Sequence, residues 1–214
     1  ADTGIDRENV VMVPFSKTIG QHYAAFRKEV QDITGVQQTA TSQVAMYRGN
    51  YIMAVKPKGS NEMIFLPILS VDENFVSVLG LDWKITPTDP LLHTRTNAVI
   101  LNETAVERLN LATSPLNEKL EDEYIVTGVI KDFNYYSLES KISALGLFIT
   151  TDADTTNGWT KRNGCLFAKI NAHTNMSALL QQMKTIYEKY DPQIPFEFSF
   201  MDEAYNELYK SEAR

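Results

Sequence analysis

The stretch Tyr124-Ile-Val-Thr-Gly-Val-Ile-Lys-Asp-Phe-Asn-Tyr-Tyr-Ser-Leu-Glu-Ser140 is the part of the chain that best indicates its fold. Its first half, residues 124–130, is rich in β-branched and aromatic side chains, which predicts a buried strand. Gly128 lies inside this strand, where a glycine indicates either a bulge or a close backbone approach. We therefore expect this strand to be a central element of the fold.

Large apolar side chains continue after the strand, in a segment too polar and irregular to be another core strand. Such a loop either packs on its own domain or offers its rings to a partner. We expect Asp132 to fix the turn and Phe133 to pack inward. Tyr135 or Tyr136 is then the candidate for contact with a partner.

The N-terminal end of the chain predicts a β-α-β unit. Val10–Phe15 is a short apolar strand, and Ser16 is placed to cap the helix that follows. One apolar stripe at spacings of three and four defines this helix: Ile19, Tyr23, Phe26, Val30 and Ile33. Gly35 closes the helix, and the polar, β-branched run Gln37–Tyr47 predicts a strand with one wet face.

The C-terminal end repeats this form, with a strand at Cys165–Ile170, a helix over residues 176–190 and a strand at Phe196–Phe200. Asp191-Pro192 ends the helix, because proline disfavours helical geometry in the residue before it. The helix carries one stripe of apolar side chains: Met176, Leu179, Leu180, Met183, Ile186, Tyr187 and Tyr190. This stripe is interpreted as a core face, and a groove for a partner is the alternative.

Short strands and turns dominate the middle of the chain. The expected elements are, in order, a hairpin of Tyr51–Lys56 and Met63–Leu69, a short helix within Asp72–Leu81, a loop over 86–96, a strand at Ala98–Leu101, a helix at Glu103–Leu109 capped by Asn102, a strand at Leu145–Thr150 and a loop over 152–163. The pattern predicts an α+β fold in which both chain ends pair into one ferredoxin-like layer. Residues 1–47 and 164–201 form this layer, and residues 48–163 form an inserted, strand-rich subdomain.

A last helix is predicted from Asp202 to Arg214, with no glycine or proline to stop it. Such a helix is expected where a longer one was truncated, and equally where a natural terminus frays. No run approaches the roughly 20 apolar residues of a membrane span, and the N-terminus lacks the basic and apolar blocks of a signal peptide. The sequence is thus compatible with a segment cut from a longer protein.

The composition is that of an ordinary globular chain, with 43% hydrophobic residues among 214. A formal net charge of -7 argues against nucleic acid as a partner, because phosphate binding needs clustered Lys and Arg. The single cysteine, Cys165, lies among apolar residues and is expected to be a small buried hydrophobe. A single cysteine cannot form a disulfide within the chain, so it does not indicate whether the protein lies in an oxidising or a reducing compartment.

No pattern for catalysis or metal binding stands out. His22, His93 and His173 lie far apart, and none has a second His or Cys at a ligand spacing. Lys131-Asp132, at the end of a strand, is placed as catalytic residues often are, although an ordinary turn-capping aspartate is the simpler interpretation. A hydrolase or transferase would need Asp132 within hydrogen-bond reach of one of the three histidines.

Two asparagines fit the glycosylation acceptor pattern, in Asn102-Glu103-Thr104 and Asn175-Met176-Ser177. Both coincide with predicted helix caps, which is the simpler explanation.

Three pieces of the chain resemble, in order, the MacB-like periplasmic core domain of FtsX-type ABC transporter permeases. They are the strand and helix from Asn97 to Leu111 with its Asn-Glu-Thr-Ala, the Gly-Val-Ile-Lys-Asp-Phe and Ser-Leu of the opening stretch, and the aromatic Asp-Glu helix from Phe198 to Arg214. Val10–Phe15 and Val71–Leu81 also fit, so that the resemblance covers nearly the whole chain.

The chain departs from the family pattern at three turns. Asp82-Trp83 stands where the family usually has a Gly-Arg pair, and Asn117 replaces the usual glycine of a Pro-x-Gly-Lys turn. A proline that often closes the Ser-Leu segment is missing from Ala144-Leu145. These changes affect local turns and the precise binding surface.

The resemblance implies a non-catalytic domain between the first and second membrane helices of a permease, on the periplasmic face of the bacterial inner membrane. It implies a porter-like subdomain from both chain ends, with residues 202–214 starting a stalk towards a membrane span. No cofactor and no metal are implied. The implied partners are a second permease copy or a partner permease, a cytoplasmic ATP-binding subunit and a periplasmic protein.

The implied role is mechanical, transmitting conformational change between membrane helices and periplasmic partners. The alternative is a ligand-binding or sensory extracytoplasmic domain, in which the insert and the terminal layer enclose a pocket.

Overall fold

The computed structural model describes residues 9–44, 49–89, 97–134, 142–150 and 164–201. Within these residues one mixed sheet has the order β11-β1-β10-β2-β4-β9-β6-β8-β5, with β3 paired to β4 and β7 to β8. The strands are β1 (Val10–Pro14), β2 (Val36–Ser42), β3 (Tyr51–Val55), β4 (Ile64–Val71), β5 (Trp83–Ile85), β6 (Ala98–Asn102), β7 (Lys119–Leu120), β8 (Tyr124–Ile130), β9 (Gly146–Ile149), β10 (Cys165–Ile170) and β11 (Ser199–Phe200). The helices are α1 (Lys17–Gln21), α2 (Tyr23–Gln31), α3 (Phe75–Val78), α4 (Glu103–Arg108) and α6 (Met176–Tyr190). The predicted α+β class is confirmed.

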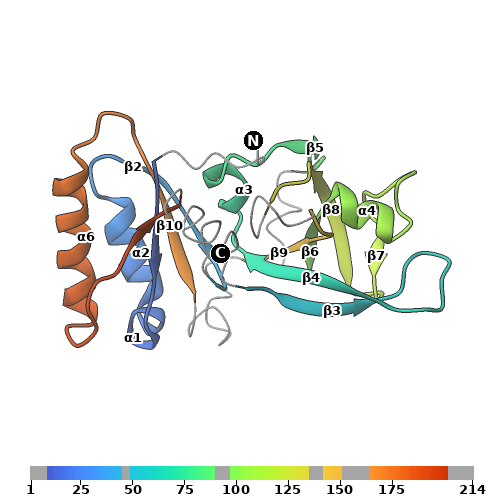
Figure 1. Ribbon diagram of the computed structural model, residues 1–214, viewed down its shortest axis with the longest axis horizontal. Helices are drawn as coiled ribbons and strands as arrows, with labels where there is room; N and C mark the ends of the chain where they lie inside the picture. The colour runs from blue at the N-terminus through green and yellow to red at the C-terminus, as the bar shows by residue number, and fades with distance from the viewer. Residues whose placement is uncertain (1–8, 45–48, 90–96, 135–141, 151–163, 202–214) are drawn as a thin grey trace, which may run out of the picture.

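Both chain ends contribute to one four-stranded part of the sheet, which we call the terminal layer: β11, β1, β10 and β2, with helices α1, α2 and α6. β10 lies antiparallel between β1 and β2, and β11 lies antiparallel on the other side of β1. This strand order is that of a split β-α-β layer, as the two terminal β-α-β patterns predicted. In Figure 1 the three helices all cover the outer face of this layer.

The single helix expected after β1 is two helices. The Ser16 side chain accepts a hydrogen bond from the Ile19 N–H at 3.1 Å, so the predicted cap is confirmed. The first helix then ends at His22, whose N–H donates to the Ile19 carbonyl at 3.0 Å, a tightened bond three residues back. The second helix starts from that residue, with Phe26 N–H donating to the His22 carbonyl at 3.0 Å.

The prediction that the strand after α2 has one solvent-exposed face is wrong for its second half. β2 ends at Ser42, and residues 39–42 are buried on both faces of the sheet. The helix α2 covers one face, and α3 of the insert packs on the other. A polar strand is tolerated there because its side chains are hydrogen-bonded, for example Thr39 to the Gln31 side chain at 2.9 Å.

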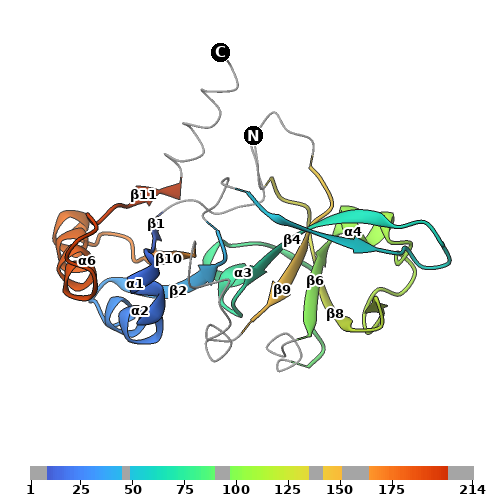
Figure 2. The same cartoon turned by 90° about the horizontal axis from the view of Figure 1, so that it is seen from below.

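The remaining strands form the insert, β3 to β9 with α3 and α4, which lies beside the terminal layer in Figure 1 and Figure 2. β3 and β4 form the predicted antiparallel hairpin. β4 pairs with β9 in parallel, β9 with β6 antiparallel, and β6 with β8 in parallel. The stretch from Tyr124 thus supplies a strand inside the sheet, with β6 on one side and β5 on the other.

Gly128 shows both features expected of a glycine inside this strand, a bulge and a close backbone approach. The pairing of β6 with β8 shifts by one residue between Val99 and Ile100, which is a bulge. A Cβ added at Gly128 would lie 2.7 Å from the Trp83 ring and 3.2 Å from Pro87. The glycine therefore lets β5 and the following turn close over β8.

Three buried apolar clusters hold these elements. One lies between the terminal sheet and its helices, and includes Phe26, Leu179, Met183 and Tyr187, so the stripe of α6 is a core face. A second lies inside the insert around α4. The third spans both halves and contains Met12, Ala40, Cys165 and Phe167 with Leu69, Phe75, Leu147 and Phe133. The predicted burial of Cys165 and Phe133 is confirmed.

Some predictions fall short or lie outside the described residues. The last strand comprises only Ser199 and Phe200, and Phe198 before it is 40% exposed. Asn117 has a φ of 70°, which explains why asparagine can replace a turn glycine. The segments containing Tyr135, Tyr136, His93 and the helix from Asp202 lie outside the described residues. In the described part, no helix combines the length and apolar character needed to cross a membrane.

Candidate functional site

The terminal layer meets the insert along a narrow junction, which we call the seam: Arg27, Thr39, Thr41, Ser42 and Gln43 on one side, and Ser70, Val71, Asp72, Asn74 and Phe75 on the other. The strand contact is small, with Ser42 opposite Val71 as the only registered pair between β2 and β4 in the described chain. Gln43 N–H donates to the Ser70 carbonyl at 2.9 Å, and Asp72 N–H donates to the Thr41 carbonyl at 3.0 Å. So short a strand contact needs other interactions to hold the two halves.

A buried ion pair provides one of them. The Arg27 Nη2 atom lies 2.5 Å from the Asp72 Oδ2 atom, and the two side chains are only 8% and 4% exposed. Arg27 comes from α2, and Asp72 follows β4 directly. The guanidinium also donates to the Thr39 carbonyl at 2.8 Å and to its hydroxyl at 3.0 Å. The pair thus ties a helix of the terminal layer to the end of an insert strand.

Asp72 also organises the start of α3. Its Oδ1 atom accepts a hydrogen bond from the Asn74 N–H at 3.0 Å. The Asn74 side chain in turn donates to the Thr39 carbonyl at 3.1 Å. The seam is therefore a connected polar network whose members come from α2, β2 and the turn between β4 and α3.

The ionisation of Asp72 reflects two opposing influences. Burial raises the pKa of this carboxyl to about 7, and the nearby Glu73 acts in the same direction. The Arg27 guanidinium opposes them by favouring the carboxylate. A buried pair of this kind contributes little net stability, whereas removing one partner leaves an uncompensated charge.

Aromatic packing completes the seam. The rings of Phe75 in α3 and Phe167 in β10 lie edge to face, with centroids 5.7 Å apart and an interplanar angle of 85°. Both side chains are fully buried in the apolar cluster that spans the two halves. This contact packs an aromatic ring of the insert against one of the terminal layer.

The predicted turn residue Asp132 belongs to a different network, inside the insert. Its carboxylate accepts hydrogen bonds from the Thr104 N–H at 3.0 Å and from the Thr104 hydroxyl at 2.7 Å. Asp132 N–H donates to the Glu103 carboxylate at 3.1 Å. These bonds join the end of β8 to the first turn of α4, as expected for a structural aspartate. The prediction of partner contact by Tyr135 or Tyr136 stays a prediction.

The histidines do not assemble a catalytic site with Asp132 in the described residues. His22 lies between α1 and α2, where its ring centroid is 5.9 Å from that of Tyr190. His173 lies in the turn after β10 with a φ of 65°. The hydrogen bonds of the Asp132 carboxylate in that part of the chain go to Thr104. Over the same residues, no group of three His, Cys, Asp or Glu side chains could hold a metal ion.

Both asparagines of the glycosylation patterns act as helix caps. The Asn102 side chain accepts from the Ala105 N–H at 2.9 Å and from the Leu145 N–H at 3.0 Å, and it is fully buried. The Asn175 side chain accepts from the Ala178 N–H at 3.1 Å. The cap interpretation of the sequence is confirmed.

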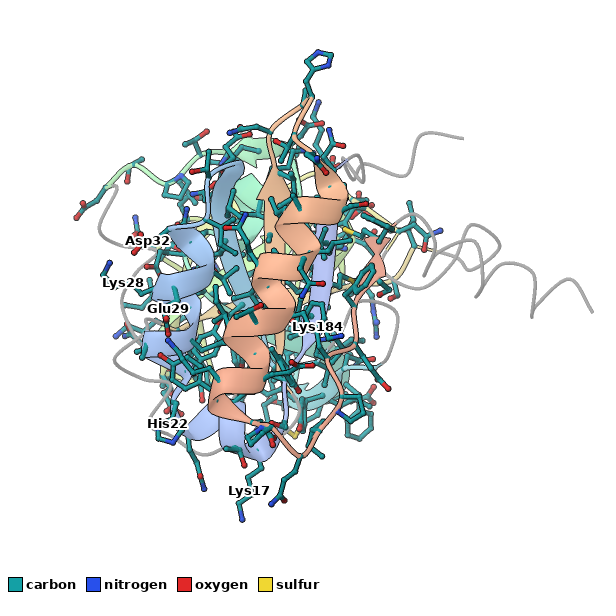
Figure 3. All side chains as sticks on the ribbon, turned by 90° about the vertical axis from the view of Figure 1, so that its left-hand side faces the viewer. Lys17, His22, Lys28, Glu29, Asp32 and Lys184 are labelled. Atoms are coloured by element: carbon teal, nitrogen blue, oxygen red, sulfur yellow. The ribbon has the colours of Figure 1, made fainter. Side chains whose placement is uncertain are left out.

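The outer face of the terminal helices is charged and paired. Figure 3 shows α6 beside α2, with Lys28 and Glu29 of α2, its C-cap Asp32 and Lys184 of α6 on the outer face. Lys28 Nζ lies 2.7 Å from Asp32 Oδ2. The Glu29 carboxylate accepts hydrogen bonds from the Lys189 ammonium and from the Tyr190 hydroxyl. Both bonds lower the pKa of this carboxyl, and the bond from Lys189 has the larger effect. This face is therefore a solvated surface with matched charges.

A pocket of about 520 Å³ lies within the insert, between α3 and β5. All its lining residues fall between Glu73 and Pro87, so none belongs to the terminal layer. This pocket is therefore not enclosed between the two halves, and the expectation of a pocket there stays a prediction. Neither the pocket nor the seam was visible in sequence, because Arg27 and Trp83 find their partners only through the fold.

Searches with family models and against curated proteins found no match for the chain. Solved structures do match. The periplasmic region of MacB from Actinobacillus actinomycetemcomitans superposes with a TM-score of 0.66 at 14% identity, covering 96% of this chain and 94% of that one. The chain has the MacB periplasmic fold.

Two further structures agree with this MacB-like fold. A domain of a putative permease protein from Porphyromonas gingivalis matches with a TM-score of 0.62 at 15% identity, covering 91% of each chain. The extracellular domain of the noncanonic ABC-type transporter YknZ from Gram-positive bacteria matches with a TM-score of 0.60 at 13% identity, covering 90% of this chain and 100% of that one. The MacB-like resemblance predicted from sequence is confirmed at the level of the fold, over both halves of the molecule.

Proposed function

We propose that this chain is a non-catalytic extracytoplasmic domain of an ABC transporter permease, which transmits movement between membrane helices and periplasmic partners. The observation that carries the proposal is the MacB-like fold, which extends over both the terminal layer and the insert. Two independent subdomains in the same arrangement are a stronger match than either alone.

The entry and exit of the described chain support this role. β1 and β11 are antiparallel neighbours, with Val11 opposite Phe200, so the beginning of β1 lies beside the end of β11. Two membrane connections reaching the domain here would displace the same edge of the terminal layer. The seam then passes that displacement to the insert through Arg27, Asp72 and Phe75. A small shift at the membrane becomes a larger one at the far end of a rigid body.

The proposal includes the assembly in which the domain works. The domain lies on the periplasmic face of the inner membrane and works with a second permease copy or a partner permease. A cytoplasmic ATP-binding subunit supplies the energy, so the domain itself needs no cofactor. A periplasmic protein is the proposed partner for the surface away from the membrane connections.

The full reading frame and the assembled permease test the proposal. The frame is expected to encode a hydrophobic span of about 20 residues on each side of this domain. Spin labels at Gln181→Cys in the two copies, in a Cys165→Ala background, are expected to change their separation when ATP replaces ADP. A reading frame without such spans would contradict the proposal. So would a distance between the spin labels that is the same with ATP and with ADP.

The pocket beside α3 favours a second candidate function, a ligand-binding or sensory extracytoplasmic domain. Its volume falls in the range of small-molecule sites, roughly 300–1,000 Å³. The two candidates differ in what they require, since a sensor needs a ligand that stabilises the domain and a lever does not. A thermal-shift screen with peptides, lipids and metabolites separates them, because a saturating ligand raises the melting temperature.

A further inference from the structure

The pocket between α3 and β5 has the shape and chemistry of a binding site. It has a volume of about 520 Å³, and Val76 of α3 and Trp83 of β5 line it from opposite elements. The remaining wall comes from the turn at Gly80 and Leu81 and from the segment ending at Pro87. Apolar walls with a few polar groups are the usual composition of small-molecule sites.

The aromatic wall is fixed in place by the sheet beneath it. Trp83 pairs with Ile130 in the ladder between β5 and β8. Its ring also lies over Gly128, where an added Cβ would come within 2.7 Å of the indole. Since a larger residue at position 128 would push the ring away, the glycine holds the indole against β8. The wall is therefore formed before any ligand binds.

The charge of the pocket has one sign. Glu73 and Asp82 are the two ionisable residues that line it, and both are acidic. Glu73 is partly buried and lines the pocket together with Trp83. A cationic donor is the partner that stabilises a carboxylate most, and more so where water is partly excluded. The same two charges repel anions.

We propose that this pocket binds a small organic cation, with its ammonium group at Glu73 and its apolar body against Trp83. The face of an indole attracts a cation, and the attraction grows when the cation leaves water. Asp82, at the rim, attracts the same charge from solution. This assignment goes beyond the mechanical role and does not depend on it.

Three probes of similar shape and different charge test the proposal on the 214-residue chain: 2-phenylethylammonium, 2-phenylethanol and phenylacetate. Titration calorimetry at low ionic strength is expected to give the ammonium ion at least about tenfold tighter binding than the alcohol, from the cation–aromatic and charge terms together. Phenylacetate is expected to bind weakest. Equal affinities for the three probes, or no binding of the ammonium ion at millimolar concentration, would overturn the proposal.

Variants locate the binding. Glu73→Gln keeps the shape of the side chain and is expected to weaken the ammonium ion about tenfold while leaving the alcohol unchanged, because a charged donor gains most from a charged acceptor. Glu62→Gln, on the exposed hairpin tip, is the matched control and should change neither affinity. If Glu73→Gln binds like the wild type, the site is elsewhere and the proposal fails.

A second variant keeps the test decisive if Glu73→Gln does not fold, as judged by circular dichroism. Asp82 is exposed, so Asp82→Asn is expected to fold and to weaken the ammonium ion selectively. Gly128→Ala displaces the Trp83 ring and is expected to weaken both the ammonium ion and the alcohol. These measurements use the chain in solution, so their failure leaves the permease proposal standing, and the reverse also holds.

Discussion

The seam and the junction between β8 and α4 both place an aspartate at the end of a strand, yet they use it differently. Asp72 at the end of β4 is 3% exposed and contacts Arg27 of the terminal layer. Asp132 at the end of β8 is partly exposed and contacts Thr104, within the insert. One joins two halves of the molecule, and the other ties a helix to its own sheet.

This difference shows that the surroundings, more than the residue type, decide what a strand-end aspartate does. At the junction the carboxylate is partly exposed and accepts from the neutral donors of Thr104, so its contribution is that of an ordinary cap. At the seam the carboxylate has lost its water, so its partner must be charged. Removing a partner should therefore cost far more at the seam than at the junction.

The largest effect is expected from Arg27→Met, which leaves Asp72 buried without its counter-ion. We expect a loss of about 3–5 kcal/mol in the free energy of unfolding, measured by urea denaturation at pH 7.5. Lys28→Met is the matched control, since this neighbouring residue forms an exposed pair with Asp32 and its replacement should change the stability little.

The double variant Arg27→Met with Asp72→Leu sharpens this test. An apolar pair of similar volume removes both charges, and such replacements are often neutral, so most of the lost stability should return. If Arg27→Met costs no more than Lys28→Met, the ion pair does not hold the seam.

A pH dependence specific to Asp72 is expected next. Because the pKa of the folded state is raised to about 7, the folded protein binds this proton more tightly than the unfolded chain. The stability from this group is fully present below about pH 4 and is lost as the pH rises through 7, by roughly 1.4 kcal/mol for each unit between the two pKa values. The stability of the wild type minus that of Asp72→Asn should therefore fall between pH 4.5 and pH 8. A rise over this interval would show that Arg27 outweighs burial.

A smaller effect is expected at the junction. Asp132→Ala removes two acceptors from the first turn of α4 and should cost about 1 kcal/mol, the usual value for a lost helix cap. The measurement is again urea unfolding at pH 7.5, with Glu62→Ala as an exposed acidic control. A loss as large as that of Arg27→Met would remove the distinction between the two aspartates.

The smallest effect is expected from Lys84→Met. Lys84 Nζ lies 2.9 Å from Glu103 Oε2 beside the junction, and both groups are partly exposed. This hydrogen bond lowers the pKa of the Glu103 carboxyl, yet an exposed pair contributes little to stability. Urea unfolding of this variant is expected to show a smaller loss than that of Asp132→Ala, and high salt should reduce the loss further because it screens the pair. A loss as large as that of Asp132→Ala would mean that the junction depends on charge as the seam does.

The sequence was sufficient for features that depend on neighbouring residues. Ser16, Asn102 and Asn175 were predicted as helix caps because each cap side chain and the backbone N–H that donates to it lie within three residues. The terminal layer was also predicted, because two β-α-β patterns at the chain ends leave few topologies. Both predictions rest on patterns among residues that are close in sequence.

Features that depend on distant partners could not be predicted. Arg27 lies next to Phe26 of the apolar stripe in α2. Nothing near it in sequence indicates a contact with Asp72. β5 and β7, of three and two residues, are too short to show a period and form only because β8 offers them an edge. The break at His22 is different, since it lies two residues after Gly20, a weak helix former that was a local signal for it.

The central claim is that the seam makes the terminal layer and the insert move as one body. Spin labels at Gln181→Cys on α6 and Glu62→Cys on the hairpin tip, in a Cys165→Ala background, measure the distance between the two halves in the assembled permease. The account predicts the same mean distance and width with ADP and with trapped ATP, and a broader distribution only when Arg27 is replaced by Met. A distance that changes with the nucleotide in the otherwise unaltered domain would contradict the account, because the seam would then be a hinge.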